Sequence, residues 1–208
     1  MTNHLQEKAV TRNLPPKSDQ KIAVLAVHGR NQEPDYILNI CDRLGWNHHA
    51  TIAPKAANKT WYPGGFMTPV QENEPNLTIA LEAIKSKLEE LNEHGFSNDR
   101  IIILGFSQGA CLASEFAARN PDKYKALIFL TGGLIGEKLR TDYSGDFQQT
   151  PVYITTSEID EWVPVSRVEE TADIFKKMNS HLFMKIYKDR EHEVSEDEIA
   201  HINEMISL

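Results

Sequence analysis

The segment RIIILGFSQGACLASEFAARNP, residues 100–121, decides how this chain folds. It begins with a short apolar run, which is typical of a buried strand. Residues 107–120 have the composition of a helix, which ends where Pro121 follows. Between strand and helix lies Ser107, at the centre of the pentapeptide GFSQG at residues 105–109. The sequence therefore predicts a sharp strand-to-helix turn with a serine at its centre.

Such a turn leaves room only for very small residues beside the serine, and Gly105 and Gly109 meet that requirement. The turn lifts the Ser107 hydroxyl out of the sheet edge, next to a helix N-terminus whose backbone N–H groups favour developing negative charge. This geometry indicates a nucleophile. The alternative is that Ser107 only caps the helix and the glycines only allow close packing.

Elsewhere, strands alternate with helices, which favours βαβ units and a mostly parallel sheet with helices on both faces. The expected strands are residues 21–29, 49–55, 100–105, 125–133, 151–158 and 181–187, and the expected helices are residues 34–45, 76–95, 107–120, 165–179 and 195–208. Active sites in sheets of this kind lie at the carboxyl ends of the strands. Candidate residues are therefore sought just after each strand.

The domain organisation is simple. Residues 1–20 are polar, contain Pro15 and Pro16, and are expected to form an N-terminal arm. Residues 21–208 are expected to form one domain, because no linker or repeat divides them. No insertion is long enough to form a large lid, so we expect a compact molecule with an open site.

Composition excludes several classes of function. The chain is 40% hydrophobic and 25% charged, with a formal net charge of −8, so its charge does not favour nucleic acid or anionic membrane surfaces. The N-terminus lacks the apolar core of a signal peptide, and no window approaches the ~20 apolar residues of a membrane span.

Cys41 and Cys111 lie in apolar, helical stretches, as expected for reduced thiols in the cytoplasm. The histidines show no zinc-ligand spacing, so neither a metal nor another cofactor is expected.

A serine hydroxyl needs a base to become a nucleophile, and that base is usually a histidine oriented by a carboxylate. In this architecture the chain order is serine, acid, histidine. Asp160 follows the strand at 151–158 and is the expected acid. Its competitors are Glu158, at the end of that strand, and Glu161, expected to face solvent.

The expected base is His192, in the loop between the last strand and the last helix. His201 lies within that helix, and His181 begins the strand at the opposite end of the sheet. The remaining histidines precede the serine in the chain: His4, His28, His48, His49 and His94.

A tetrahedral intermediate also needs backbone N–H donors, which form an oxyanion hole. The first expected donor is Gln108, directly after the serine, and the second is Arg30, in the loop after the strand at 21–29. His28, beside that loop, is interpreted as structural support.

Five segments together resemble the phospholipase/carboxylesterase family of α/β-hydrolases, which includes acyl-protein thioesterases and bacterial carboxylesterases. They are AVHGR, WYPGGF, LGFSQGA, EIDEWVP and EHEVSEDE, spread over most of residues 21–205. The resemblance implies an α/β-hydrolase fold and a serine hydrolase without a metal or cofactor. It places nucleophile, acid and base on the same three residues, Ser107, Asp160 and His192.

The chain departs from the family pattern at three places. Residues 30–32 read Arg-Asn-Gln where family members often have glycine and aspartate. Residues 155–157 read Thr-Thr-Ser where a glycine is common, and Glu191 precedes the histidine where glycine is frequent. These departures bear on substrate identity more than on catalysis.

A long irregular stretch, residues 56–75, carries the WYPGGF motif, and loops of this length are usually functional. Its side chains and those of two other loops are candidates for an acyl or aromatic pocket: Trp61, Tyr62, Phe66, Met67, Leu134, Ile135 and Trp162. The alternative is that they anchor loops on the core. An apolar loop surface is also compatible with a homodimer.

We therefore expect an enzyme that cleaves small carboxylic esters or thioesters through an acyl-enzyme. One alternative is a lactone hydrolase of the dienelactone type, although that group favours a cysteine nucleophile. The other is a ligand-binding module that keeps the fold without catalysis.

Overall fold

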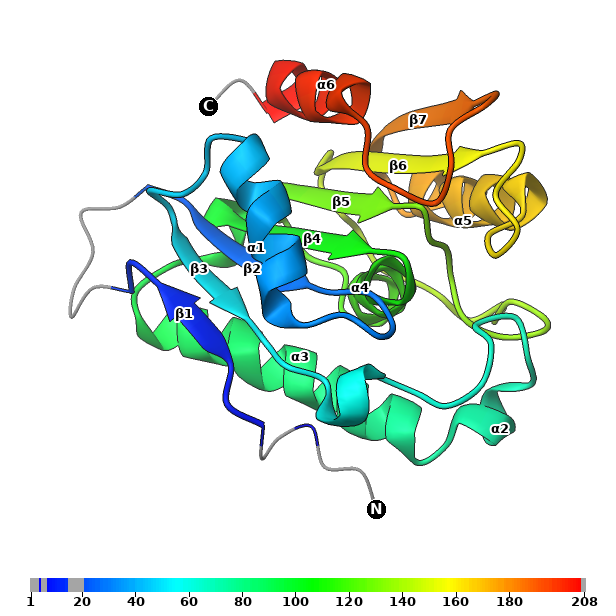
Figure 1. Cartoon of the computed structure of the whole chain (residues 1–208), viewed down its shortest axis with the longest axis horizontal. Helices are drawn as coiled ribbons and strands as arrows, with labels where there is room; N and C mark the ends of the chain where they lie inside the picture. Colours follow the sequence, from blue (N-terminus) through cyan, green and yellow to red (C-terminus); the bar gives the residue numbers. More distant parts are fainter. Residues whose placement is uncertain (1–3, 5–6, 15–20, 207–208) are drawn as a thin grey trace.

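The computed structural model describes residues 4, 7–14 and 21–206 (Figure 1). In chain order its elements are β1 (Val10–Arg12), β2 (Ala23–Val27), α1 (Pro34–Arg43), β3 (Ala50–Ala53), the 3₁₀ helix η2 (Ala57–Lys59), α2 (Val70–Asn73), α3 (Asn76–Glu93), the 3₁₀ helix η3 (Asn98–Arg100), β4 (Ile101–Phe106), α4 (Gln108–Arg119), β5 (Ala126–Leu130), β6 (Pro151–Ser157), α5 (Val165–Lys177), β7 (His181–Tyr187) and α6 (Glu196–Ile206). The strands form one sheet in the order β1-β3-β2-β4-β5-β6-β7.

The expected mostly parallel sheet is confirmed, because every neighbouring pair from β3 to β7 runs parallel. Each expected strand and helix is present, with ends that differ by a few residues. A capping box begins α6: the Ser195 N–H donates to Glu198 Oε2 at 2.8 Å, and the Glu198 N–H donates to Ser195 Oγ at 3.2 Å.

The N-terminal arm contributes one element that the sequence did not indicate. Residues 10–12 form β1, which pairs antiparallel with β3 at the sheet edge. This strand has three residues and a mostly exposed surface, so it carries no apolar alternation. Residues 15–20, at the predicted end of the arm, and residues 207–208, at the predicted end of the last helix, lie outside the described residues.

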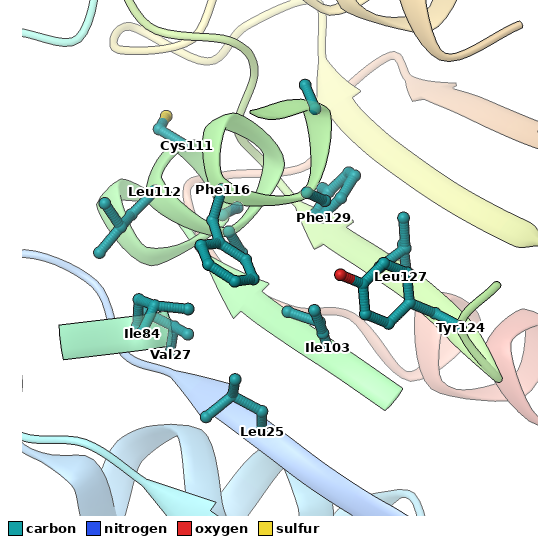
Figure 2. Close-up of a cluster of buried hydrophobic side chains, with 14 of the residues drawn as sticks. Leu25, Val27, Ile84, Ile103, Cys111, Leu112, Phe116, Tyr124, Leu127 and Phe129 are labelled. Atoms are coloured by element: carbon teal, nitrogen blue, oxygen red, sulfur yellow. The ribbon is translucent and has the colours of Figure 1, made fainter. Parts of the chain in front are cut away.

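Helices cover both faces of the sheet, which explains why its inner strands are continuous apolar runs. In β4, Ile101 and Ile103 pack toward α3, α4 and α5, while Ile102, Leu104 and Phe106 pack toward α1 and α6. Figure 2 shows the first of these two cores, where side chains of β2, β4 and β5 meet Leu112 and Phe116 of α4.

The turn between β4 and α4 is as tight as the sequence predicts. Ser107 has φ 55° and ψ −123°, and it occupies the N-cap position without a capping hydrogen bond from its side chain. A Cβ atom on Gly105 would lie 2.5 Å from the Gly109 carbonyl oxygen, and one on Gly109 would lie 2.2 Å from that of Val27. Both glycines are therefore needed to bring α4 against β2 and β4.

The longest described stretch without a helix or strand, residues 131–150, is anchored on the core rather than inserted as a lid. Leu134, Ile135 and Phe147 of this stretch are buried. No helix in the described part of the chain combines the length and the apolar character that crossing a membrane requires.

We expect Gly109→Ala to lower the free energy of unfolding by about 3 kcal/mol or more, because its Cβ would overlap the backbone of β2. Urea unfolding measures the change. Gly65→Ala is the matched control, since its Cβ would have only an ordinary contact at 3.4 Å, with Thr68 Cγ2. Equal stability of the two variants would contradict the packing argument.

Candidate active site

Three side chains expected from chain order lie in one hydrogen-bonded line. The Nε2 atom of His192 is 2.8 Å from Ser107 Oγ, and its Nδ1 atom is 2.7 Å from Asp160 Oδ2. They come from the loops that follow β4, β6 and β7, at the carboxyl ends of these strands. The competing carboxylates, Glu158 and Glu161, are exposed.

The Asp160 carboxylate is held on both oxygens. Its side chain is fully buried, and Oδ1 accepts hydrogen bonds from the N–H groups of Trp162 and Val163, each at 2.9 Å. Burial by itself raises the pKa of Asp160, but the hydrogen bonds from His192, Val163 and Trp162 outweigh it, and the pKa lies below its ordinary value. Asp160 is therefore ionised at neutral pH.

An ionised Asp160 fixes the tautomer of His192. The carboxylate can only accept, so Nδ1 carries the proton and Nε2 is free to accept the proton of the Ser107 hydroxyl. The imidazole also packs on the ring of Phe106, with 5.3 Å between centroids. The excluded His201 contacts Asp197 and Lys185 instead.

The expected oxyanion donors lie beside Ser107. A Cβ atom on Gly29 would come within 3.2 Å of Ser107 Cβ, so the loop after β2 touches the serine. Arg30 and Gln108 line the same cavity as Ser107. Among the backbone–backbone hydrogen bonds of the turns, loops and caps in the described residues, none uses the N–H of Arg30 or Gln108.

His28 stabilises this loop by hydrogen bonds of its ring with backbone groups. It is fully buried, its Nδ1 is 2.7 Å from the Gly29 carbonyl oxygen, and its Nε2 accepts the N–H of Ala56 at 3.1 Å. Burial lowers the pKa of His28, so the ring is neutral. These contacts agree with a structural role.

A cavity of about 480 Å³ opens beside Ser107 and His192. Apart from these two residues, its lining consists of Arg30, Asn31, Tyr62, Pro63, Gly64, Gly65, Phe66, Gln108, Cys111, Trp162 and Val163. The lining is mostly apolar, as is usual for a small-molecule site.

The predicted pocket residues divide into two groups. Tyr62, Phe66 and Trp162 line the cavity, and Trp162 is 70% exposed at its mouth. The others do not line it: Trp61, Leu134 and Ile135 are buried in the core, and Met67 is partly exposed. Apolar composition identified both groups but does not encode the direction of a side chain.

Two side chains whose backbones alone were considered from the sequence also hold the cavity wall. The Arg30 guanidinium donates to the carbonyl oxygens of Tyr62, Pro63 and Gly64 at 3.0, 2.9 and 2.5 Å. The Gln108 amide donates to the Tyr62 carbonyl at 2.9 Å and accepts the Trp61 N–H at 3.0 Å. The sequence marked residue 30 only as a departure from the family pattern and carried no signal for these contacts.

The N-terminal arm reaches the back of this wall. The Nδ1 atom of His4 accepts the N–H of Ala57 at 3.0 Å, and its Nε2 donates to the carbonyl of Trp61 at 2.8 Å. The Trp61 indole N–H in turn donates to the carbonyl of His28 at 2.8 Å. The sequence carried no signal for this role of His4.

Cys111 was expected only as a buried thiol, and the structure adds that it lines the cavity one helical turn after Ser107. Burial raises the pKa of its thiol to about 12, so it stays protonated. In the described part of the chain, no three His, Cys, Asp or Glu side chains are arranged to hold a metal ion.

Sequence and fold are both similar to those of known proteins. The family model of phospholipases and carboxylesterases matches residues 17–208. A crystal structure of a phospholipase/carboxylesterase from Dyadobacter fermentans is 40% identical, has a TM-score of 0.95, and covers 100% of this chain and 99% of its own. Acyl-protein thioesterase 1 of Kluyveromyces lactis is 27% identical over 177 residues, which are 77% of this chain and 78% of that protein.

A more distant structure, the Bacillus cereus carboxylesterase, is 16% identical with a TM-score of 0.76, covers 97% of this chain and 94% of its own, and shares the fold. The expected α/β-hydrolase fold is thereby confirmed. The chain belongs to the phospholipase/carboxylesterase family.

Proposed function

We propose that this protein hydrolyses carboxylic esters or thioesters through an acyl-enzyme on Ser107. The observation that carries the proposal is the hydrogen-bonded line from Asp160 through His192 to Ser107, at the edge of a mostly apolar cavity. Membership of the phospholipase/carboxylesterase family supports the same class of substrate.

In the first half of the reaction, Ser107 Oγ attacks the substrate carbonyl carbon while His192 Nε2 takes the hydroxyl proton. Negative charge develops on the carbonyl oxygen, where the N–H groups of Gln108 and Arg30 stabilise it. The bond to the leaving alcohol or thiol then breaks, and that group takes the proton from Nε2. Asp160 holds the Nδ1 proton and stabilises the imidazolium.

In the second half, water attacks the acyl carbon and gives a proton to His192 Nε2. The tetrahedral intermediate collapses, Ser107 Oγ recovers the proton, and the carboxylic acid leaves. Besides substrate and water, these steps use only side chains and backbone groups of the chain, so the proposal includes no cofactor.

The cavity supports a small apolar or aromatic acyl group as the part of the substrate that is bound. A lactone hydrolase remains the alternative within the same chemistry, and a ligand-binding module the alternative without it. We extend the proposal to the cytoplasm, where Cys41 and Cys111, both free and buried, would stay unpaired.

Ser107→Ala and His192→Ala should each lower kcat/KM by about 10⁴-fold or more, because nucleophile and base act as one unit. Hydrolysis of p-nitrophenyl esters from acetate to palmitate measures the loss, and thermal unfolding verifies the fold. Wild-type activity that persists in folded Ser107→Ala protein would eliminate the acyl-enzyme. Activity of the wild type on lactones alone would favour the lactone hydrolase, and no reaction with a fluorophosphonate probe would favour the binding module.

Asp160 should also make stability depend on pH. Its pKa in the folded protein is below the ordinary value, so its contribution is complete above the unfolded-state pKa of about 3.9 and is lost as pH falls through the folded-state pKa. We expect the difference in free energy of unfolding between wild type and Asp160→Asn to be constant above about pH 5 and to shrink toward pH 2.5. Urea unfolding at each pH tests this, and a difference that grows as pH falls would contradict it.

Arg30→Ala should loosen the cavity wall while the backbone N–H at residue 30 remains. The lost contacts to the carbonyls of Tyr62, Pro63 and Gly64 are worth roughly 1–3 kcal/mol, so we expect KM to rise about 10-fold with a smaller change in kcat. Steady-state kinetics on one ester measures both. Arg12→Ala is the control, since Arg12 pairs with Asp42 on the surface. An unchanged KM in Arg30→Ala would contradict the role of the Arg30 side chain in holding the cavity wall.

A further inference from the structure

The loop that carries His192 has an unusual local geometry. Residues 188–195 connect β7 to α6, and the N–H of Glu193 donates to the carbonyl of Glu191 at 2.8 Å. This bond closes a three-residue turn with His192 at its centre. The direction of the imidazole therefore depends on how the carbonyl groups of Glu191 and Glu193 are held.

Both carbonyl groups are contacted by one buried side chain. The Nη1 atom of Arg190 donates to the carbonyl oxygens of Glu191, at 3.4 Å, and Glu193. Its Nη2 atom donates to Thr131 Oγ1, just after β5, at 2.9 Å. Arg190 is only 6% exposed, so the guanidinium points into the protein rather than toward solvent.

A second buried charge faces this guanidinium. The carboxylate of Glu198 is fully buried, and its Oε2 atom lies 3.6 Å from Arg190 Nε. Its Oε1 atom accepts the Thr155 hydroxyl at 2.6 Å, while Oε2 also accepts the Ser195 N–H. Glu198, in the first turn of α6, is thereby tied to β6 and to the end of the preceding loop, which makes it a fixed counter-charge.

A buried ion pair adds little net stability, since desolvation of both charges opposes their attraction. Its structural effect here is to connect β5, β6 and α6 to the two peptide groups that flank one histidine. We infer that Arg190, held by Glu198 and Thr131, is a positioning residue that fixes the His192 imidazole between Asp160 and Ser107. Neither the Arg190 nor the Glu198 side chain touches the reacting atoms.

This inference rests on the proposed function for its kinetic test but not for its spectroscopic one. A histidine Nδ1–H hydrogen-bonded to a carboxylate gives a proton resonance far downfield of the amide envelope, whether or not the protein turns over a substrate. His192→Ala assigns that resonance in the full chain.

The chain offers a matched control. Arg43 of α1 also contacts this loop, donating to the carbonyl of Val194 at 2.7 Å and pairing with Glu196. It does not contact the carbonyl groups that flank His192. Arg43→Gln therefore removes an arginine contact from the same loop without releasing the three-residue turn.

The experiment compares wild type with Arg190→Gln, Arg190→Lys, Glu198→Gln and Arg43→Gln, using p-nitrophenyl butyrate kinetics, thermal unfolding and the downfield proton spectrum. We expect Arg190→Gln to lower kcat about 100-fold with KM within about 3-fold, because small displacements of a catalytic group cost that much, and to lose the downfield resonance. Arg190→Lys should restore part of the kcat that Arg190→Gln loses. The kcat of Glu198→Gln should lie between those of wild type and Arg190→Gln, and Arg43→Gln should match wild type.

A folded Arg190→Gln protein with wild-type kcat and an intact resonance would overturn the inference. If Arg190→Gln does not fold, Arg190→Lys and Glu198→Gln decide: both unchanged in kcat and resonance would equally overturn it. If the wild type hydrolyses no ester, the proposed function fails, while loss of the resonance in Arg190→Gln but not in Arg43→Gln would still support the positioning role.

Discussion

At Gly109 the first turn of α4 lies directly against the backbone at the end of β2, with no space for even a methyl group. This contact requires a glycine, and it forces the chain between β4 and α4 through the positive φ of Ser107. Strain of this kind persists only where the surrounding structure determines it. Here two buried strands and a helix do so, and the consequence is a serine hydroxyl whose position is set by backbone packing.

The other site residues lie on loops, and polar side chains hold those loops. Asp160 is fixed by the N–H groups of Trp162 and Val163, and the wall of the cavity is fixed by Arg30 and Gln108. These contacts pair carbonyl and N–H groups that form no hydrogen bond within a strand or helix. They therefore take the place of the backbone hydrogen bonds of regular secondary structure. The site is thus a rigid serine surrounded by segments that depend on hydrogen bonds.

Much of the fold and of the site could be predicted from the sequence, because the informative signals are local. Ser107, Asp160 and His192 each follow an expected strand, and chain order together with these positions made them the candidates. The side-chain role of Arg30 could not be predicted, since it contacts residues more than thirty positions away. The strand β1 was missed because its short, exposed edge leaves no apolar pattern, and the buried Trp61 has the same composition signal as the cavity-lining Trp162.

His4, in the N-terminal arm, forms hydrogen bonds with the backbone of the loop at residues 57–61, a role that the polar composition of the arm does not indicate. His4 lies behind Trp61 and stabilises the cavity wall by its hydrogen bonds to this loop. Shortening the chain at this end, or joining an affinity tag close to His4, would therefore disturb the contacts that hold residues 57–61 behind the cavity.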